Sequence, residues 1–299
     1  MRFYREKCLL ALMENLENWV SSIKIQKLMF LLSERQDERS YDFMPYKFGC
    51  YSMQLSRDLR KLLNEGYLIT NEIDPHQYKI SRADFGFEKK INETDTEDIK
   101  RIIKRFGKWA DKELIKYTYL QYPFFAINSI MAKDILSPIE LKIINKHRLN
   151  KEERCLFTIG YEGRSLEKYI VELLKNGVKV LCDVRKNAFS QKFGFSKAQL
   201  LKACEGTGIS YIHLPNLGII SEKRKNLENQ DDYDILFKEY ECTVLENSKA
   251  ELNIIFQLLQ NEKRVALTCY ERDFHQCHRS RVAQKLMSIR QCNYLLENI

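Results

Sequence analysis

The stretch that decides the fold is residues 156–185, which read LFTIGYEGRSLEKYIVELLKNGVKVLCDVR. The apolar run LFTIGY predicts a strand. It is followed by a segment with apolar residues at helical spacing, which Gly177 closes, and then by a second apolar run, VKVLCDV. A strand, a helix and a strand of these lengths predict a right-handed crossover between parallel strands. The stretch therefore indicates an α/β domain.

The same alternation continues towards the end of the chain. Helices are expected at 196–208, 233–262 and 277–289, and strands at ISYIHLP (209–215) and RVALTCY (264–270). We therefore predict an α/β domain over residues 151–299, with a mostly parallel, Rossmann-like sheet and flanking helices. The polar segment LNKEERC, residues 149–155, is the expected linker to a first domain over residues 1–150.

The first domain is expected to be mainly helical. Three helices are predicted at 4–19, 23–35 and 53–66, with Ser22 and Ser52 as caps of the second and third. Two short strands, YLIT and QYKISR, follow the third helix. Three helices and a small β-hairpin in this order are typical of a winged helix-turn-helix domain.

The charge, hydropathy and cysteine content limit the classes of protein to which the chain can belong. The 299 residues carry a net charge of +8, a mild excess that permits contact with nucleic acid without requiring it. No apolar stretch approaches the ~18 residues of a membrane span. Nine cysteines occur singly, which fits reduced thiols better than disulfides. We therefore expect a cytoplasmic protein with no membrane partner.

Basic residues lie on or near the third helix, at Lys47, Arg57, Arg60 and Lys61. They are candidates for contact with DNA phosphates or with a protein partner. The alternative is a solvated helix face, since phosphate binding needs a basic surface rather than single charges.

Polar residues gather where the predicted parallel strands end. Because ligands in open α/β sheets bind beyond the carboxyl ends of the strands, these residues are expected to share one site. Gly160 permits close approach of backbone, and Ser165 is placed to cap the next helix. The whole set comprises Gly160, Tyr161, Ser165, Asp183, Arg185, His213, Cys269, Cys277, His278 and Arg279.

These residue types suggest an anion site with acid–base groups. Asp183 is a candidate general base or acceptor for a ribose hydroxyl, and an ion pair with Arg185 or Arg279 is the alternative. The two arginines are expected to clamp a phosphate or carboxylate, helped by N–H groups at the helix start. His278 or His213 is the candidate proton donor, and a buried structural role is the alternative for His213.

The set of strand-end residues also contains two cysteines, Cys269 and Cys277. Cys277 is expected at a helix start beside His278 and Arg279, conditions that lower a thiol pKa, so it is a candidate nucleophile. Its spacing to Arg279 is too tight for the anion loop of sulfurtransferases or cysteine phosphatases. Cys269 ends an apolar strand and fits a small buried residue. The spacing C-x5-H-x-C-H, beginning at Cys269, is no standard zinc pattern, so neither metal nor cofactor is expected.

Four segments resemble the family called domain of unknown function 488. They are TIGYEGRSLEKYIVELL, VLCDVRKNAFSQKFGFSKAQL, ISYIHLPNLG and VALTCYERDFHQCHRSRVAQ, and together they span about residues 154–290. The resemblance implies a common site that holds the strand-end residues named above except Ser165. The chain departs from the pattern at 186–188, where Ser-Asn-Pro is expected, and at 216–219, where a glycine pair is usual.

The first domain resembles the Panacea (antitoxin-like) domain over about residues 1–135. The matching segments are KIQKLMF, YDFMPYKFGCYSMQLSRDL, LLNEGYL and FGKWADKELIKYTYLQYPF. One departure is Gly49-Cys50, where the family has Gly-Pro. Because the family occurs in toxin-neutralising and phage-related contexts, the resemblance implies a defence role with protein binding at least as much as DNA binding.

Three functions fit these observations. The first is an enzyme, hydrolase or glycosidase-like, that processes a nucleotide, nucleoside or nucleic-acid base and is targeted by the N-terminal domain. The second is a non-catalytic, nucleotide-sensing regulator or antitoxin-like module. The third is thiol or sulfur-transfer chemistry. Sequence alone does not separate the first two, because both need the same anion site.

Overall fold

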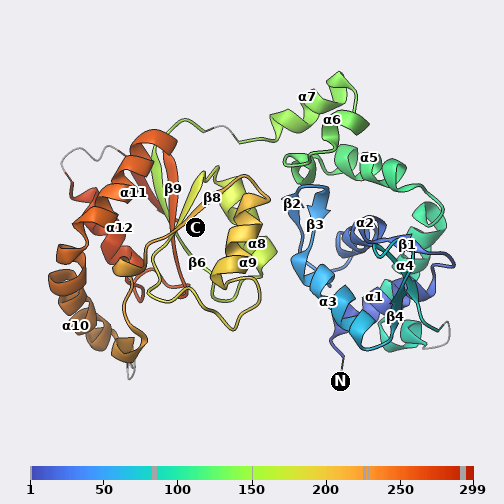
Figure 1. The fold of residues 1–299 in the computed structure, drawn as a ribbon, viewed down its shortest axis with the longest axis horizontal. Coiled ribbons are helices and arrows are strands. Elements are labelled where there is room, and N and C mark those ends of the chain that lie inside the picture. Colours follow the sequence, from blue (N-terminus) through green and yellow to red (C-terminus); the bar gives the residue numbers. More distant parts are fainter. Residues whose placement is uncertain (1, 83–85, 150, 225–226, 228, 290–293) are drawn as a thin grey trace. The chain divides into compact units, whose positions relative to one another are not determined.

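The computed structural model describes residues 2–82, 86–149, 151–224, 227, 229–289 and 294–299. The chain divides into two compact units, Met1–Arg148 and Leu149–Ile299 (Figure 1). None of the helices in the described part of the chain combines the length and the apolar character that crossing a bilayer requires.

The N-terminal unit joins helices to two small antiparallel sheets. One sheet has the strand order β1-β5-β4, and the other is the hairpin β2-β3. In chain order its elements are α1 (Tyr4–Glu14), β1 (Val20–Ser21), α2 (Ser22–Ser33), β2 (Met44–Tyr46), β3 (Gly49–Tyr51), α3 (Met53–Asn64), β4 (Leu68–Thr70), β5 (Gln77–Ile80), η1 (Phe87–Lys90), α4 (Glu93–Phe106), α5 (Asp111–Gln121), η2 (Pro123–Ala126), α6 (Ala132–Ile135) and α7 (Pro138–Lys146).

The three expected helices and the hairpin β4-β5 are present, with corrected ends. The first helix stops at Glu14 rather than at Trp19, whose side chain is exposed. The cap of α2 is Ser21, whose hydroxyl accepts the Lys24 N–H, and not Ser22. Ser52 caps α3 as predicted, by accepting the Leu55 N–H.

The residues around Pro45 and Gly49 form the antiparallel hairpin β2-β3. The ammonium group of Lys27, buried in α2, donates hydrogen bonds to the carbonyls of Phe48 and Cys50 and so ties this hairpin to the helix. Burial lowers the pKa of Lys27. Lys27, a basic residue of the KIQKLMF segment, thus has a structural role.

The C-terminal unit is built on a five-stranded parallel sheet of order β10-β6-β9-β7-β8. The three central strands are buried along their whole length, as expected for a sheet covered on both faces. Figure 1 shows α8 and α9 on one side of this sheet and α11 and α12 on the other. The strands are β6 (Cys155–Gly160), β7 (Val180–Asp183), β8 (Ser210–His213), β9 (Arg264–Cys269) and β10 (Leu295–Asn298).

The helices of this unit follow the predicted alternation with one break. They are α8 (Leu166–Lys175), α9 (Lys197–Glu205), α10 (Gln230–Tyr240), α11 (Lys249–Glu262) and α12 (Arg279–Met287), with short helical turns η3 (Pro215–Leu217) and η4 (Ser221–Arg224). The helix predicted over 233–262 is two helices, joined by the π-helical turn η5 (Glu241–Leu245). The Ser248 hydroxyl, which donates to the Val244 carbonyl, lies at the break.

Candidate functional site

The sheet register brings the predicted strand ends to one edge. Gly160 lies opposite Cys269, and Asp183 lies opposite both Thr268 and His213. A Cβ added to Gly160 would lie 1.9 Å from the Glu271 carbonyl oxygen. Glycine is therefore required where the loop after β9 crosses the end of β6.

Asp183 and Arg185 form a buried ion pair at this edge. The Arg185 Nε donates to Asp183 Oδ1 at 2.8 Å, and its Nη2 donates to Oδ2 at 2.5 Å. The Tyr211 hydroxyl also donates to Oδ2, at 2.6 Å. Both carboxylate oxygens of Asp183 thus have partners within the protein. This is the structural alternative considered for Asp183, and it differs from the expectation of a general base open to a substrate.

Arg185 also orders the aromatic wall beside it. Its Nη1 donates to the Tyr161 hydroxyl at 2.8 Å and to the Phe195 carbonyl at 2.9 Å. The rings of Tyr161 and Phe195 stack with centroids 4.3 Å apart. The His213 Nε2 lies 2.9 Å from the Arg185 carbonyl, and because a carbonyl only accepts, the ring donates there. In this arrangement Arg185 and His213 hold the loop after β7 in place.

The other expected anion ligand, Arg279, lies inside the protein. Its side chain is fully buried and donates to the carbonyls of Glu271 and Arg272. Arg279 therefore anchors the loop after β9, which differs from the phosphate clamp expected from its place at a helix start. Ser165 caps α8 as its position indicated, by accepting the Lys168 N–H.

Five side chains meet at the end of β9, and we call them the thiol cluster: Arg224, Cys269, Glu271, Cys277 and His278. The His278 Nε2 lies 2.9 Å from the Val184 carbonyl and therefore carries a hydrogen that it donates. Its Nδ1 faces the sulfur atoms of Cys269 and Cys277, at 3.6 Å and 4.0 Å. The strand-end pattern thus predicted three members of this cluster correctly as neighbours.

Arg224 supplies the positive charge of the cluster. It ends the turn η4, and its Nη2 lies 2.6 Å from the His278 Nδ1 and 3.9 Å from the Cys269 sulfur. Its Nη1 forms an ion pair with Glu271. The sequence reasoning missed both Arg224 and Glu271. Arg224 lies 54 residues before His278, in a segment without periodicity, so no local pattern marks it.

The cluster makes its two thiols unequal. Burial alone would raise the pKa of Cys269, but a hydrogen bond with Cys277, the contact with His278 and the positive charge of Arg224 hold it well below the ordinary value. Burial and the neighbouring Cys269 raise the pKa of Cys277 well above it. Cys269 is therefore the more acidic of the two thiols, whereas the sequence had suggested Cys277 as the reactive one.

Glu271 is the acidic member of the thiol cluster. Its Oε2 lies 3.2 Å from the Cys269 sulfur. Burial and the negative charge of Cys269 raise its pKa, against the opposing effect of Arg224. A carboxyl group with a raised pKa beside a thiolate is suited to carry a proton during a reaction.

The same atoms have the composition of a metal site. Among the described residues, Cys269, Cys277 and His278 offer ligand atoms that all lie within 4.8 Å of one another. The Arg224 Nη2, at 2.6 Å from the His278 Nδ1, lies where a metal ion would bind that nitrogen. The cation that these groups face is thus an arginine, and the cluster as arranged does not fit a metal.

Cys269 and Arg224 form part of the wall of a cavity of about 300 Å³ at the sheet edge. The cavity lies between the loops that follow β6, β7, β8 and β9, as expected for a ligand site in this fold. Its lining comprises Tyr161, Arg185, Lys186, Asn187, Phe189, Ser190, Ile219, Arg224, Cys269, Tyr270 and Glu271.

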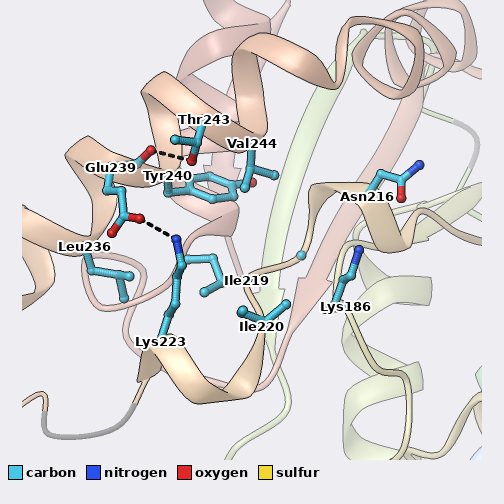
Figure 2. A pocket seen from close by; sticks show the side chains of 11 residues that line it. Lys186, Asn216, Ile219, Ile220, Lys223, Leu236, Glu239, Tyr240, Thr243 and Val244 are labelled. Carbon is cyan, nitrogen blue, oxygen red and sulfur yellow. Dashed lines mark hydrogen bonds and ion pairs between the residues drawn. The ribbon is translucent and has the colours of Figure 1, made fainter.

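A second cavity, of about 180 Å³, adjoins the first and shares Lys186 and Ile219 with it. Figure 2 shows the ion pair of Lys223 and Glu239 on one side of this cavity, with Lys186 and Asn216 on the other. Its other lining residues are mostly apolar: Gly218, Ile219, Ile220, Leu236, Tyr240, Thr243 and Val244.

The two segments that depart from the family pattern line both cavities. A Cβ added to Gly218 would lie 1.9 Å from the backbone nitrogen of Lys186. The loop after β8 is therefore packed directly on the loop after β7. The two departures seen separately in the sequence form one structural feature.

The basic residues expected to contact DNA or a partner differ in their surroundings. Lys61 forms an ion pair of 2.6 Å with the buried Glu6. Arg57 and Arg60 are exposed on α3, and Lys47 is exposed in the turn between β2 and β3. Lys61 thus has a structural partner in the core, whereas the other three side chains are exposed.

The C-terminal unit matches the model of a protein family. The model of a family described as Domain of unknown function DUF488 matches residues 165–286. No curated protein matches the chain. The matched region contains the whole thiol cluster and most of the lining of both cavities, but Gly160 and Tyr161 precede it. The resemblance of the N-terminal unit to the Panacea domain stays a prediction.

Proposed function

We propose that the C-terminal unit is an enzyme that processes a nucleotide, nucleoside or nucleic-acid base, with Cys269 as its nucleophile. The observation that carries the proposal is the position of Cys269. Its sulfur faces Arg224 and Glu271 at the wall of a cavity, at the sheet edge where α/β proteins bind ligands.

The two adjoining cavities support this substrate class. The first contains Arg224 and Lys186, which suit a phosphate or another anionic group. The second presents Tyr240 and aliphatic side chains, which suit a planar base. Because both cavities share Lys186 and Ile219, one ligand with an anionic end and an apolar end can occupy both.

The cluster also provides the other groups that a thiolate reaction needs. Arg224 stabilises the Cys269 thiolate and the anionic group of the substrate. His278, fixed by its bond to Val184, keeps its Nδ1 towards the sulfur. Glu271, whose pKa is raised by burial and by Cys269, is placed to pass a proton to the leaving group. In this scheme Asp183 and Arg185 form the scaffold of the site.

For the N-terminal unit we propose binding of DNA or of a protein partner. The order of three helices and the hairpin β4-β5 supports a winged-helix type of domain. Arg57 and Arg60 are exposed on α3, the helix that would face a nucleic acid. The unit would bring the enzyme to its target.

A sensor without turnover is the second candidate. It is favoured by the burial of the thiol cluster, in which Cys269 is 1% exposed, and by the complete pairing of Asp183. A regulator of this kind would use the same cavities to bind a nucleotide and would form no product.

The test is turnover by the purified full-length chain. Nucleotides, nucleosides and oligonucleotides with modified bases are incubated with the protein, and products are measured by liquid chromatography and mass spectrometry. Product from the wild type and from Cys242→Ser, an exposed thiol control, but not from Cys269→Ser, supports the proposal. Saturable binding without product identifies the sensor, and full turnover by Cys269→Ser rejects the nucleophile.

A further inference from the structure

We propose that Cys269 and Cys277 form a reversible disulfide when a peroxide oxidises the site. The inference goes beyond the proposed activity, because it concerns a modification of the two thiols themselves. It rests on the proposed thiolate character of Cys269 but requires no substrate.

The backbone brings the two thiols together from separate elements. Cys269 is the last residue of β9, and Cys277 lies just before α12. Both sulfur atoms approach one nitrogen, the His278 Nδ1, and the three atoms lie within 4.8 Å of one another. The two sulfur atoms thus lie no more than 4.8 Å apart in the reduced protein.

The loop between the thiols is fixed at several points. Arg279 donates to the carbonyls of Glu271 and Arg272, and the Arg272 N–H donates to the Glu162 carboxylate at 3.0 Å. These bonds hold the two cysteines near each other in the reduced protein. The entropy lost on closing the disulfide is therefore largely lost already when the chain folds.

The two thiols differ in pKa, and this difference determines which one reacts first. The Cys269 thiolate attacks the O–O bond of the peroxide, takes one oxygen as sulfenic acid, and releases hydroxide or alkoxide. The sulfur of Cys277 then attacks the Cys269 sulfur, and the sulfenic hydroxyl leaves with the Cys277 proton as water. Two electrons pass from the thiol pair to the peroxide, and a thiol reductant reverses the change.

Cys269 is also the thiol that a small oxidant can reach. It lines the first cavity beside Arg224, whereas Cys277 is fully buried behind it. Burial raises the pKa of the Cys182 thiol, which lies inside β7, to about 12, and a thiol of this kind is far less reactive.

Mass spectrometry tests the proposal directly. The reduced full-length protein is treated with hydrogen peroxide, blocked with N-ethylmaleimide and digested with trypsin. Cleavage after Arg264, Arg272 and Arg279 separates the peptides VALTCYER and DFHQCHR. We expect these two peptides to be recovered as one linked species, lighter by two hydrogens than their sum, which dithiothreitol separates.

Variants distinguish the disulfide from other outcomes. In Cys277→Ser and Cys277→Ala, checked for folding by circular dichroism, Cys269 should remain as sulfenic acid that dimedone labels. Cys242→Ser should form the linked species like the wild type. Free, alkylated Cys269 and Cys277 after oxidation, or stoichiometric zinc bound by the cluster, would overturn the proposal. Nucleotide turnover is assayed separately on the reduced protein, so that failure of the disulfide and failure of the proposed activity are distinguishable.

Discussion

Arg185 and Asp183 form an ion pair with two hydrogen bonds in the interior of the C-terminal unit. The Arg185 Nε donates to Asp183 Oδ1 at 2.8 Å, and its Nη2 donates to Oδ2 at 2.5 Å. Such a pair stabilises a fold only as long as it is complete, since either partner alone leaves a buried charge without compensation. Both its position beneath the first cavity and its burial make it a structural support for the site.

Removal of one partner should therefore destabilise the C-terminal unit. For Asp183→Asn we expect the free energy of unfolding to fall by about 3–5 kcal/mol, because the Arg185 guanidinium stays buried without its counter-charge. Denaturant unfolding followed by circular dichroism measures this. Glu262→Gln, on an exposed residue at the end of α11, is the matched control and should change little. A neutral effect of Asp183→Asn would contradict the described packing.

The pKa of Cys269 should determine how the rate of its alkylation changes with pH. Because the pKa lies well below the ordinary thiol value, the thiolate fraction and hence the rate of alkylation should persist as the pH falls below about 8.5. Arg224→Gln removes a neighbouring positive charge and should move this profile to higher pH. Lys223→Gln, one residue earlier, is the control. Iodoacetamide labelling at a series of pH values, read per peptide, gives both profiles.

Gly160 should tolerate no side chain. In Gly160→Ala the new methyl group would meet the Glu271 carbonyl, so the loop after β9 must move, at an expected cost of about 1–3 kcal/mol in unfolding free energy. The same movement should slow alkylation of Cys269. Gly163→Ala is the comparison, since nothing lies within 4 Å of its Cβ and only its φ of +72° is strained. Retained Cys269 reactivity in Gly160→Ala would show that the loop does not hold the thiol.

Lys186 should matter for binding more than Lys223 does. Lys186 borders both cavities, whereas Lys223 borders only the second and is paired with Glu239. Replacement of Lys186 with alanine should weaken binding of a nucleotide about tenfold, the usual order for one charged hydrogen bond. Isothermal titration calorimetry on Lys186→Ala and Lys223→Ala makes the comparison. Equal losses in both variants would argue against a ligand that spans the two cavities.

In the N-terminal unit, the exposed arginines and Lys61 should behave differently. If α3 faces DNA, Arg57→Ala with Arg60→Ala should lower affinity and reduce the salt dependence of binding by about one unit of slope per lost phosphate contact. Lys61→Ala should instead lower stability, because the buried Glu6 loses a partner. Fluorescence anisotropy at several salt concentrations, with thermal unfolding in parallel, separates the two effects. Binding unaffected by the double change would favour a protein partner.

Much of the C-terminal architecture could be predicted from the sequence. The strands β6, β7, β8 and β9 follow from apolar runs between amphipathic helices, and their parallel arrangement fixes which residues share an edge. The strand β10 was not predicted, because LLEN is short and its partner β6 lies at the other end of the unit's sequence. A pairing of this kind depends on tertiary contact and leaves no local signal.

The roles within the site could not be predicted in the same way. Sequence position places Arg185 and Arg279 at the edge but does not say where their side chains turn, and both are used inside the protein. The arginine that faces the thiols, Arg224, comes from an irregular loop. Which cysteine has the lower pKa depends on contacts with Cys277, His278 and Arg224 that no local sequence pattern shows, so the choice between Cys269 and Cys277 required the three-dimensional structure.

The close packing of Gly218 on Lys186 ties the loop after β8 to the loop after β7 at the border of both cavities. The two cysteines come from the end of β9 and the β9–α12 connection, whereas Arg224 belongs to the same β8–α10 loop as Gly218. Replacements at residues 186–188 and 216–219 would change the shape offered to a ligand without changing either cysteine. Homologous proteins that differ at these two loops are thus expected to share a reaction and to diverge in the molecules on which they use it.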